Sequence, residues 1–447
     1  MRAREGRVAY LSGAGTKRGA RGAKRRTLLT IPRRVTVAIL NVGVVFGGVS
    51  PEHEVSIISS LQAAAALDRS RYRPVPIYIA KDGVWLTGER LLDIEAYKEL
   101  DRLRASAVPV MLDPRAYGAL ELIEARRAGL FARPRRRRID VMFLGLHGGA
   151  GENGGLQGLC ETFNVPYTGS GVLGSALGMD KVLSKMLCRD QNIPVVDFTA
   201  FRESEWGDHE EAWLDRCEAA LGYPVVVKPA RLGSSIGIAK VKDRAALDAA
   251  VEEAFRYDDK VIVEKAVQNL REINCAVLGD PDEAVASVLE EPVTGEELLT
   301  YREKYLRGGD GGAKGAPRRR GAKRAESAAG MASLDRIIPA PLPDDRTREI
   351  RDLAVRVFRL FECSGVARID FMLDAATGQV YFNEINTIPG SFSFYLWEPS
   401  GVPFDELTHR MIELARKRHR DANSRIHTYD VNLLAEKSLS GLKGAKG

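Results

Sequence analysis

Hydrophobic and polar positions along the chain form short apolar runs that alternate with longer amphipathic stretches. The apolar runs predict strands at Val35–Phe46, Tyr72–Ile79 and Ile139–Leu146, and the spacing across Val55–Leu67 predicts a helix. Strands that alternate with helices are typical of a parallel sheet with helices on its faces. Residues 35–172 are therefore expected to form an N-terminal α/β domain.

Residues 173–270 are expected to form a central domain with a similar mixture of elements. The pattern predicts, in chain order, a helix at Met179–Cys188, a strand at Val225–Lys228, a strand ending at Val241, a helix at Ala245–Phe255 and a strand at Val261–Glu264. A Gly/Ser-rich loop, Arg231–Gly237, separates the first two strands.

Residues 271–428 are expected to form a third domain, which begins with a strand at Glu272–Leu278. Within it, residues 307–334 are rich in Gly, Ala and Arg without any periodicity, which predicts an exposed or mobile loop. The ends of the chain, 1–34 and 429–447, are expected to be a disordered basic extension and a frayed tail, because they have little to bury.

Two neighbouring strands of the third domain are predicted to carry a cluster of polar side chains. A strand at Val366–Leu373 carries Arg368 and Asp370, and the next apolar run leads into Glu384 and Asn386. The members of each pair are two residues apart, so they share a strand face. The side-chain oxygen atoms of Asp370, Glu384 and Asn386 would suit Mg²⁺, which prefers hard ligands. A hairpin with solvated polar tips would give the same spacing.

Two glycine-rich loops follow predicted strands of the first domain. In FGGVSPEHEVS, Gly47 and Gly48 allow a tight turn, and Ser50 is expected to cap the following helix. Glu52 would either support the start of that helix or bind a substrate ammonium at the carboxyl end of the sheet. In LHGGAGENGG, the glycine density indicates close backbone approach to a ligand, and His147 is either a structural or a catalytic histidine.

The central domain carries the residue types of a nucleotide site. Lys228 ends a strand directly before the loop Arg231–Gly237, and backbone N–H groups with a lysine charge suit phosphate. The lysine precedes the glycines, so the segment is neither a GxxxxGK[ST] loop nor a GxGxxG fingerprint. Glu264 and the backbone at 265–267 could contact a ribose and an adenine edge. A plain Gly/Ser hairpin loop and an ordinary strand end are the alternatives.

Basic residues are concentrated in two segments, so the formal net charge of +6 does not describe the body of the protein. Residues 1–34 hold eleven Lys/Arg and one acid, residues 307–325 hold seven and one, and the remainder carries −10. An acidic body argues against a nucleic-acid footprint over a whole domain, although either basic segment could contact RNA or acidic lipid. Arg33-Arg34 before an apolar run would also fit a twin-arginine export signal, but a first buried strand explains that run better.

Cysteine usage and hydropathy indicate the cellular compartment of the protein. The five cysteines are widely spaced and contain no CxxC pair, which is typical of free thiols in a reducing cytosol. No apolar run reaches the roughly 18–20 residues of a membrane span. A cytoplasmic protein is therefore expected.

Taken together and in this order, nine segments resemble the D-alanine–D-alanine ligases of the ATP-grasp superfamily. The segments are FGGVSPEHEVS, LHGGAGENGGLQG, PYTGSG, MDKVLSK, VVVKPARLGSSIG, VIVEKAV, YREKYL, GVARIDFML and NEINTIPG. They extend over about residues 35–410. The resemblance implies a three-domain α/β ATP-grasp architecture with an N-terminal parallel-sheet domain.

The resemblance implies an ATP site and a metal site. Residues that match the ATP site are Lys181, Lys228, Ser234, Ser235, Glu264, Lys265, Val267, Glu272 and Lys304. Lys181 and Lys228 would hold the α- and β-phosphates. The Arg231–Gly237 loop would close over the γ-phosphate, and the backbone of Lys265 and Val267 would contact adenine. Residues that match ligands of two Mg²⁺ ions, with Mn²⁺ as a possible substitute, are Asp370, Glu384 and Asn386.

It also implies catalytic and substrate-binding residues. Glu52 matches the acid that binds the ammonium of the first D-alanine, and His147 lies near that amino acid. Arg368 and the backbone N–H of Gly390 match the oxyanion site. Residues that match a loop triad linking the γ-phosphate to the substrate are Ser234, Lys304 and Tyr305.

The implied reaction joins two D-alanines for peptidoglycan precursor synthesis. ATP phosphorylates the carboxylate of the first D-alanine, and the amine of the second attacks the acyl phosphate. After NTIPG the family usually continues with a Thr/Ser-rich stretch that ends in a serine for the second substrate, whereas Ser391–Trp397 here places Tyr395 at that position. Tyr305 is typical of D-alanine as the acceptor.

Two other functions are weighed against this one. The first is an ATP-grasp ligase with another acceptor, such as D-serine, D-lactate or a different amino acid. The second is a nucleotide-binding scaffold whose basic tails bind RNA or membrane, which the retained lysines, the metal cluster and Arg368 argue against. The resemblance further implies a homodimer.

Overall fold

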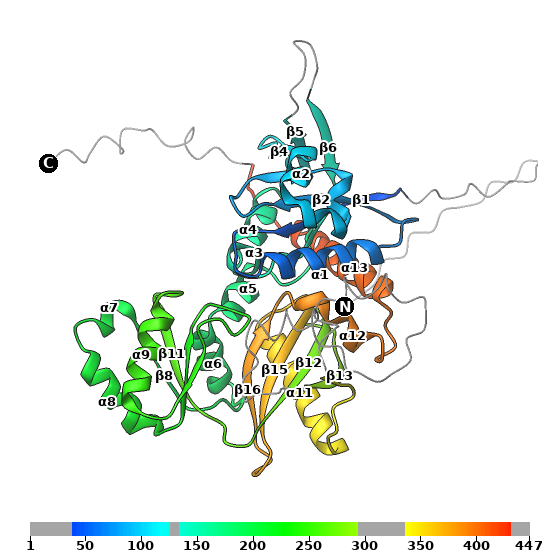
Figure 1. Ribbon diagram of the computed structural model, residues 1–447. Coiled ribbons are helices and arrows are strands. Elements are labelled where there is room, and N and C mark those ends of the chain that lie inside the picture. Colours follow the sequence, from blue (N-terminus) through cyan, green and yellow to red (C-terminus); the bar gives the residue numbers. More distant parts are fainter. Residues whose placement is uncertain (1–37, 126–133, 294–335, 431–447) are drawn as a thin grey trace, which may run out of the picture. The chain divides into compact units, whose positions relative to one another are not determined.

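The computed structural model describes residues 38–125, 134–293 and 336–430, and its strands build three separate β-sheets (Figure 1). The first sheet contains β1 (Leu40–Gly47), β2 (Tyr72–Ile79), β3 (Trp85–Thr87), β4 (Val108–Leu112), β5 (Leu120–Glu124), β6 (Arg135–Ile139) and β7 (Val141–Leu144). Its strand order is β6-β5-β4-β3-β2-β1-β7. The predicted parallel arrangement is confirmed for β2, β1 and β7, and antiparallel strands that the hydrophobic pattern did not indicate extend the sheet through β3 to β6.

The strand β6 falls in an arginine run that the hydrophobic pattern did not identify as a strand. Arg136 forms ion pairs with Asp113 and Glu121, and Arg137 lies 3.2 Å from the carboxylate of Glu124. Glu121 and Glu124 belong to the neighbouring strand β5, and Asp113 directly follows β4, so opposite charges hold the arginines in the sheet. Cross-strand ion pairs thus outweigh the low strand propensity of the run, while the side chains of Arg135, Arg136 and Arg138 remain exposed.

The second sheet is antiparallel and has two helices packed on it. It contains β8 (Phe198–Arg202), β9 (Val225–Pro229), β10 (Ala239–Val241) and β11 (Lys260–Lys265), in the order β10-β9-β11-β8. The helices α8 (Glu210–Leu221) and α9 (Arg244–Phe255) share a hydrophobic core with it. Leu214 and Val251 from the helices and Val227 from the sheet are buried together there, which fixes one face of the sheet and leaves β9 and β11 to present the other.

The third sheet carries the polar cluster predicted from strand alternation. It contains β12 (Leu270–Gly279), β13 (Ala284–Pro292), β14 (Arg336–Ile337), β15 (Gly365–Asp374) and β16 (Val380–Asn386), in the order β14-β13-β12-β15-β16. The helix α11 (Asp344–Leu360) packs on it through Ile350, Val357 and Phe358. The residues between that helix face and the sheet are buried, so the alternating polar residues of β15 and β16 belong to the opposite face.

The remaining helices connect and cover the sheets. They are α1 (His53–Ala66), η1 (Glu89–Leu92), η2 (Ile94–Glu99), α2 (Leu100–Ser106), α3 (Gly149–Glu152), α4 (Gly155–Thr162), α5 (Val172–Met179), α6 (Lys181–Asp190), α7 (Glu203–Trp206), η6 (Gly390–Ser393), α12 (Phe394–Trp397) and α13 (Phe404–Asn423). The last helix, α13, contacts α1 and β7, and its Leu407 and Met411 share a hydrophobic core with Val45 of the first sheet (Figure 1). The end of the described chain therefore packs on the first sheet, a contact that sequence order did not indicate, and the predicted domain boundaries stay predictions.

Three smaller expectations can be compared with the structure. Ser50 is not the N-cap of α1; its hydroxyl accepts the N–H of Glu52, which itself occupies the cap position, so the prediction of a Ser50 cap is wrong by two residues. All five cysteines are buried free thiols, as predicted. Among the described residues, no helix is long and apolar enough to cross a membrane.

Candidate active site

The four polar residues predicted on β15 and β16 lie together. Asp370 is paired across the strands with Glu384, and Arg368 with Asn386. The amide nitrogen of Asn386 donates to Asp370 Oδ2 at 3.0 Å. Arg368 donates to both oxygens of Asp370, each at 2.7 Å. Strand alternation alone therefore identified a real cluster, and the hairpin with solvated tips is excluded because Asp370 and Arg368 are buried.

This oxygen cluster fits a hard divalent cation. Among the described residues, no group of three His, Cys, Asp or Glu side chains could hold a metal ion, so a cation here would need the amide oxygen of Asn386 in addition to the carboxylates of Asp370 and Glu384. Carboxylate and amide oxygens are ligands that Mg²⁺ takes alongside phosphate oxygens. Although burial acts to lower it, Asp370 raises the pKa of Arg368 well above its ordinary value, so the guanidinium stays charged beside the cluster.

Lys181 connects this cluster to the glycine-rich loop of the second sheet. It is the first residue of α6, whose N-terminus is capped by Asp180 through the N–H groups of Val182 and Leu183. The ammonium of Lys181 donates to the carbonyl of Leu232 at 2.7 Å and lies 3.1 Å from Glu384 Oε2. The cap makes the helix begin later than the predicted Met179, and it fixes the lysine at the point where the phosphates of a nucleotide are expected.

Lys228 on β9 and Glu264 on β11 lie diagonally across neighbouring strands, close to a second buried lysine. The Lys228 ammonium lies 2.7 Å from Glu264 Oε2 and donates to Asn383 Oδ1 at 3.1 Å. Lys185 Nζ lies 3.0 Å from the other oxygen, Glu264 Oε1. Burial acts to raise the pKa of Glu264, but Lys185 and Lys228 outweigh it and lower the pKa to about 2. Glu264 is thus a carboxylate shared by two ammonium groups.

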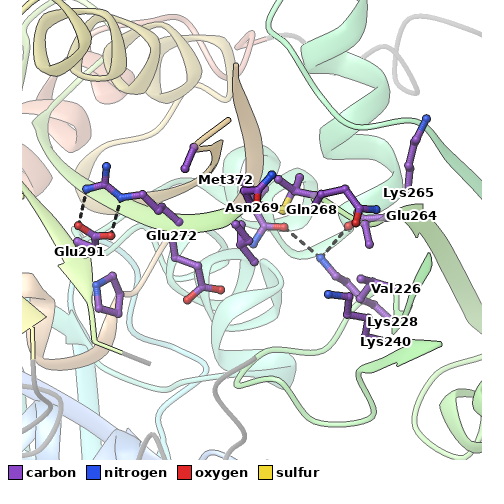
Figure 2. A pocket seen from close by; sticks show the side chains of 17 residues that line it. Val226, Lys228, Lys240, Glu264, Lys265, Gln268, Asn269, Glu272, Glu291 and Met372 are labelled. Atoms are coloured by element: carbon purple, nitrogen blue, oxygen red, sulfur yellow. Dashed lines mark hydrogen bonds and ion pairs between the residues drawn. The ribbon is translucent and has the colours of Figure 1, made fainter. Parts of the chain in front are cut away.

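A cavity of about 440 Å³ lies beside this lysine–glutamate group (Figure 2). Its lining includes Lys228, Glu264, Lys265, Val267 and Glu272, so five of the predicted ATP residues border one space. The N–H of Lys265 already donates to the carbonyl of Asp197 at 2.9 Å. The Lys265 backbone could therefore contact adenine only through its carbonyl group.

The glycine-rich loop contacts the acid predicted to bind the first amino acid. Ser234 donates a hydrogen bond to Glu52 Oε1, and a side chain at Gly233 would come within 3.0 Å of the same carboxylate. Ser234 and Ser235 both adopt left-handed backbone angles, with φ of 54° and 58°. Such angles are uncommon for residues other than glycine, which indicates that the surrounding contacts hold the loop in this form.

Glu152 is a second buried acid near Glu52, and no role was predicted for it. Its carboxylate accepts the N–H of Gly148 at 2.9 Å and the N–H of Ile388 at 3.3 Å. Burial raises the pKa of Glu152 to about 8, and the nearby charge of Glu52 adds to the shift. Glu152 thus connects the glycine loop after β7 with the segment that leads to Gly390.

His147 is buried and lies beside the same segment. Its Nε2 is 3.1 Å from the hydroxyl of Ser59, a residue that also accepts the N–H of Ser391 at 2.8 Å. Burial lowers the pKa of His147 to about 4, and the positive charge of Arg368 adds to the lowering. The imidazole is therefore neutral near pH 7 and suits hydrogen bonding to a substrate rather than charge pairing.

The segment after Gly390 has an unusual backbone. Ser391, Phe392 and Ser393 all have φ near +50°, and all three side chains are buried. Tyr395, which stands where the family usually has a serine, is also buried; its hydroxyl lies 3.3 Å from Glu290 Oε1. The Tyr395 hydroxyl is therefore already bonded within the protein.

Two predicted site residues, Lys304 and Tyr305, and the 307–334 loop lie outside the described residues. Sequence reasoning missed three side chains that the structure brings into the site, namely Glu152, Lys185 and Asn383. Each stands inside a segment that carried the family resemblance, so the signal was present. Only the contacts of the folded chain distinguish them from their neighbours.

Two antiparallel sheets, one with buried lysines and the other with a cluster of carboxylate and amide oxygens, line a cavity of about 440 Å³, and this arrangement is typical of the ATP-grasp ligases. The chain belongs to the D-alanine–D-alanine ligase family. The family described as D-ala D-ala ligase N-terminus matches residues 41–170, and the one described as D-ala D-ala ligase C-terminus matches residues 187–332 and 324–413.

Individual relatives agree with the family match. A D-alanine–D-alanine ligase from Thermosipho melanesiensis is 39% identical over 396 residues, which cover 89% of this chain and 98% of the relative. One from Geobacillus kaustophilus is 38% identical, over 87% of this chain and 98% of the relative. Among solved structures, the D-alanine-D-alanine ligase from Coxiella burnetii has a TM-score of 0.66 and 31% identity, over 86% of this chain and 96% of that structure. The VanG D-Ala:D-Ser ligase from Enterococcus faecalis has a TM-score of 0.67 and 29% identity, over 85% of this chain and all of that structure.

Proposed function

We propose that the protein joins two D-alanines to D-alanyl-D-alanine at the expense of ATP, for peptidoglycan precursor synthesis. The observation that carries the proposal is the position of Lys181, whose ammonium contacts both the glycine-rich loop at Leu232 and Glu384 of the oxygen cluster. The Lys181 ammonium thus connects the glycine-rich loop, which suits phosphate, with the oxygen cluster, which suits a metal ion. The family membership and the relatives' activity support the same reaction over the whole site.

The first step is phosphoryl transfer from ATP to the carboxylate of the first D-alanine. Lys181 and Lys228 neutralise phosphate charge, and the loop with Ser234 and Ser235 covers the terminal phosphate. Glu52 holds the ammonium of this D-alanine, and the neutral His147 donates or accepts a hydrogen bond beside it. In-line transfer depends on such positioning and charge neutralisation rather than on covalent catalysis.

The second step is attack by the amine of the second D-alanine on the acyl phosphate. The tetrahedral intermediate places negative charge on the former carbonyl oxygen, and Arg368 with the N–H of Gly390 stabilises it. A preorganised donor of this type contributes about 3–4 kcal/mol. The intermediate then loses phosphate, which leaves the new peptide bond. The loop that contacts Glu52 also keeps water from the acyl phosphate.

Asp370, Glu384 and Asn386 would hold two Mg²⁺ ions, for which Mn²⁺ could substitute. When bound, the ions would supply positive charge that neutralises the charge on phosphate oxygens. Arg368 donates to both oxygens of Asp370, so the guanidinium and the ions would share this carboxylate. We further propose a homodimer in the cytoplasm, for which the five buried free thiols are consistent with a reducing compartment. Light scattering on the purified protein tests the dimer.

Phosphate release tests the reaction itself. Purified protein with ATP, Mg²⁺ and D-alanine should release phosphate, and the product should have the mass of D-alanyl-D-alanine. Omission of D-alanine is the control, because the release should depend on it. A mixture of D-alanine, D-serine and D-lactate tests the acceptor. A single product with D-serine or D-lactate in the second position would overturn the choice of acceptor.

A further inference from the structure

Lys185 has no role in the reaction described above, yet it is the most completely buried charged side chain of the site. Its side chain is 0% exposed, and its ammonium lies 3.0 Å from Glu264 Oε1 and 3.3 Å from the carbonyl of Phe382. It stands one helical turn after Lys181 on α6, so both lysines face the same side of the helix. Burial of an ammonium group costs folding free energy unless the group is paired. The position of Lys185 therefore indicates a role beyond packing.

The reason lies in the charge of the group around Glu264. Glu264 Oε2 is 2.7 Å from Lys228, and a carboxylate this close to a single ammonium would cancel its charge. Lys185 on the other oxygen, Oε1, makes the group of three side chains positive by one unit. Lys228 and Glu264 line the cavity, whereas Lys185 is not part of its lining among the described residues (Figure 2). The extra positive charge of the group is therefore presented to the cavity by Lys228.

Two nearby groups leave the charge of these three side chains unchanged, although the charged residues Lys240, Lys265 and Glu272 also line the cavity. Lys181 is itself paired with Glu384 at 3.1 Å, so that pair is neutral. Asn383, the other partner of Lys228, is neutral as well. Burial lowers the pKa of Lys185, and the charge of Lys228 adds to the lowering, whereas Glu264 opposes both.

We propose that Lys185 is a positioning residue that holds Glu264 from behind the cavity, so that the positive charge of Lys228 remains available to the phosphates of the nucleotide. The inference rests on the proposed ATP site. It predicts that loss of Lys185 lowers the affinity for the phosphate groups of the ligand and not the affinity for its adenosine part. If Lys185 had a purely structural role, its loss would lower both affinities alike.

Calorimetric titration with adenosine and with ADP in the presence of Mg²⁺ separates these cases, since the ratio of the two affinities measures the contribution of the phosphates. In Lys185→Met, Glu264 would pair with Lys228 alone, and the ratio of ADP to adenosine affinity should fall at least tenfold. Adenosine affinity should stay within about threefold of the wild type. A ratio that stays within threefold of the wild type in folded Lys185→Met would overturn the inference.

The double variant Lys185→Met/Glu264→Gln provides a second test that does not leave a buried carboxylate with one partner. Removal of both charges leaves Lys228 unpaired with any carboxylate of this group, so the ratio should return to within threefold of the wild type. A double variant that keeps a tenfold loss would contradict the account, even where the single variant fails to fold.

Lys417→Met is the control for loss of a lysine ion pair outside the cavity, because Lys417 pairs with Asp280 at 2.6 Å and neither residue lines the cavity. It should leave the ratio unchanged. If wild-type protein binds neither ADP nor adenosine, the proposed function itself fails. If the wild type binds both ligands and Lys185→Met has the same ratio of ADP to adenosine affinity, the proposed role of Lys185 is wrong while the proposed function stands.

Discussion

Replacement of Arg368 by lysine should separate the oxyanion role of this residue from its role in folding. Arg368 is buried and donates two hydrogen bonds of 2.7 Å to Asp370 through its planar guanidinium. Lysine keeps the positive charge beside Asp370 but cannot form the two-pronged contact or reach the same position. Loss of one oxyanion donor costs about 3 kcal/mol of transition-state stabilisation, which lowers kcat about 100- to 1,000-fold.

The same substitution should affect stability far less than activity. One of two charge-assisted hydrogen bonds to Asp370 is lost, and such a bond contributes about 1.5–3 kcal/mol. A stable domain tolerates that loss, because its free energy of unfolding is about 5–15 kcal/mol. The variant should therefore fold, with a lower midpoint of thermal unfolding.

Steady-state phosphate release at saturating ATP and D-alanine measures kcat, and circular dichroism measures the unfolding midpoint. Arg115→Lys is the matched control, because Arg115 also binds an aspartate two residues away, Asp113, through two contacts of 3.0 Å. It should leave kcat unchanged. A folded Arg368→Lys variant with kcat within threefold of the wild type would refute the assignment of Arg368 to the oxyanion.

Three further predictions address the metal cluster, the core and a buried acid. Glu384→Ala should abolish turnover while circular dichroism shows an intact fold, because Glu384 is partly exposed and supplies charge rather than packing; turnover close to the wild type would mean that the metal site lies elsewhere. Phe358→Ala should lower the free energy of unfolding by about 3–5 kcal/mol in urea titrations, because Phe358 is fully buried between α11 and the third sheet; a loss below 1 kcal/mol would contradict this packing, and Phe358→Leu should retain most of the stability. Glu152 has a folded-state pKa raised to about 8, so its contribution to stability is present below its ordinary pKa of 4.5 and is lost as the pH rises to 8. Glu152→Gln should remove that part of the pH dependence of unfolding in metal-free protein, and an unchanged slope between pH 5 and 8 would reject the raised pKa.

Regular elements with strong periodicity could be predicted from the sequence. The strand at Tyr72–Ile79 was predicted with the bounds that the structure gives, and the helix at Arg244–Phe255 within one residue. Short elements such as Trp85–Thr87 contain too few residues for a period to appear. The strand Arg135–Ile139 depends on carboxylates of the neighbouring strands, which the local sequence does not show.

The candidate site also contains residues that could be predicted from the sequence and residues that could not. Arg368, Asp370 and Asn386 could be predicted as neighbours because strand alternation sets them on one face of adjacent strands. Lys185 and Glu152 could not, because Lys185 contacts Glu264 and Phe382 and Glu152 contacts Ile388, all of which are distant in sequence. Lys185, for example, contacts a carbonyl 197 residues away, and only the packing of α6 on β16 brings the two together.

The most direct test of the central claim is D-alanine-dependent phosphate release from ATP, measured on the purified full-length protein with Mg²⁺ and followed by mass spectrometry of the product. The site described here predicts phosphate release that requires both D-alanine and Mg²⁺, with one D-alanyl-D-alanine formed per phosphate. Protein that is folded and binds ATP but gives no D-alanine-dependent phosphate release would contradict it.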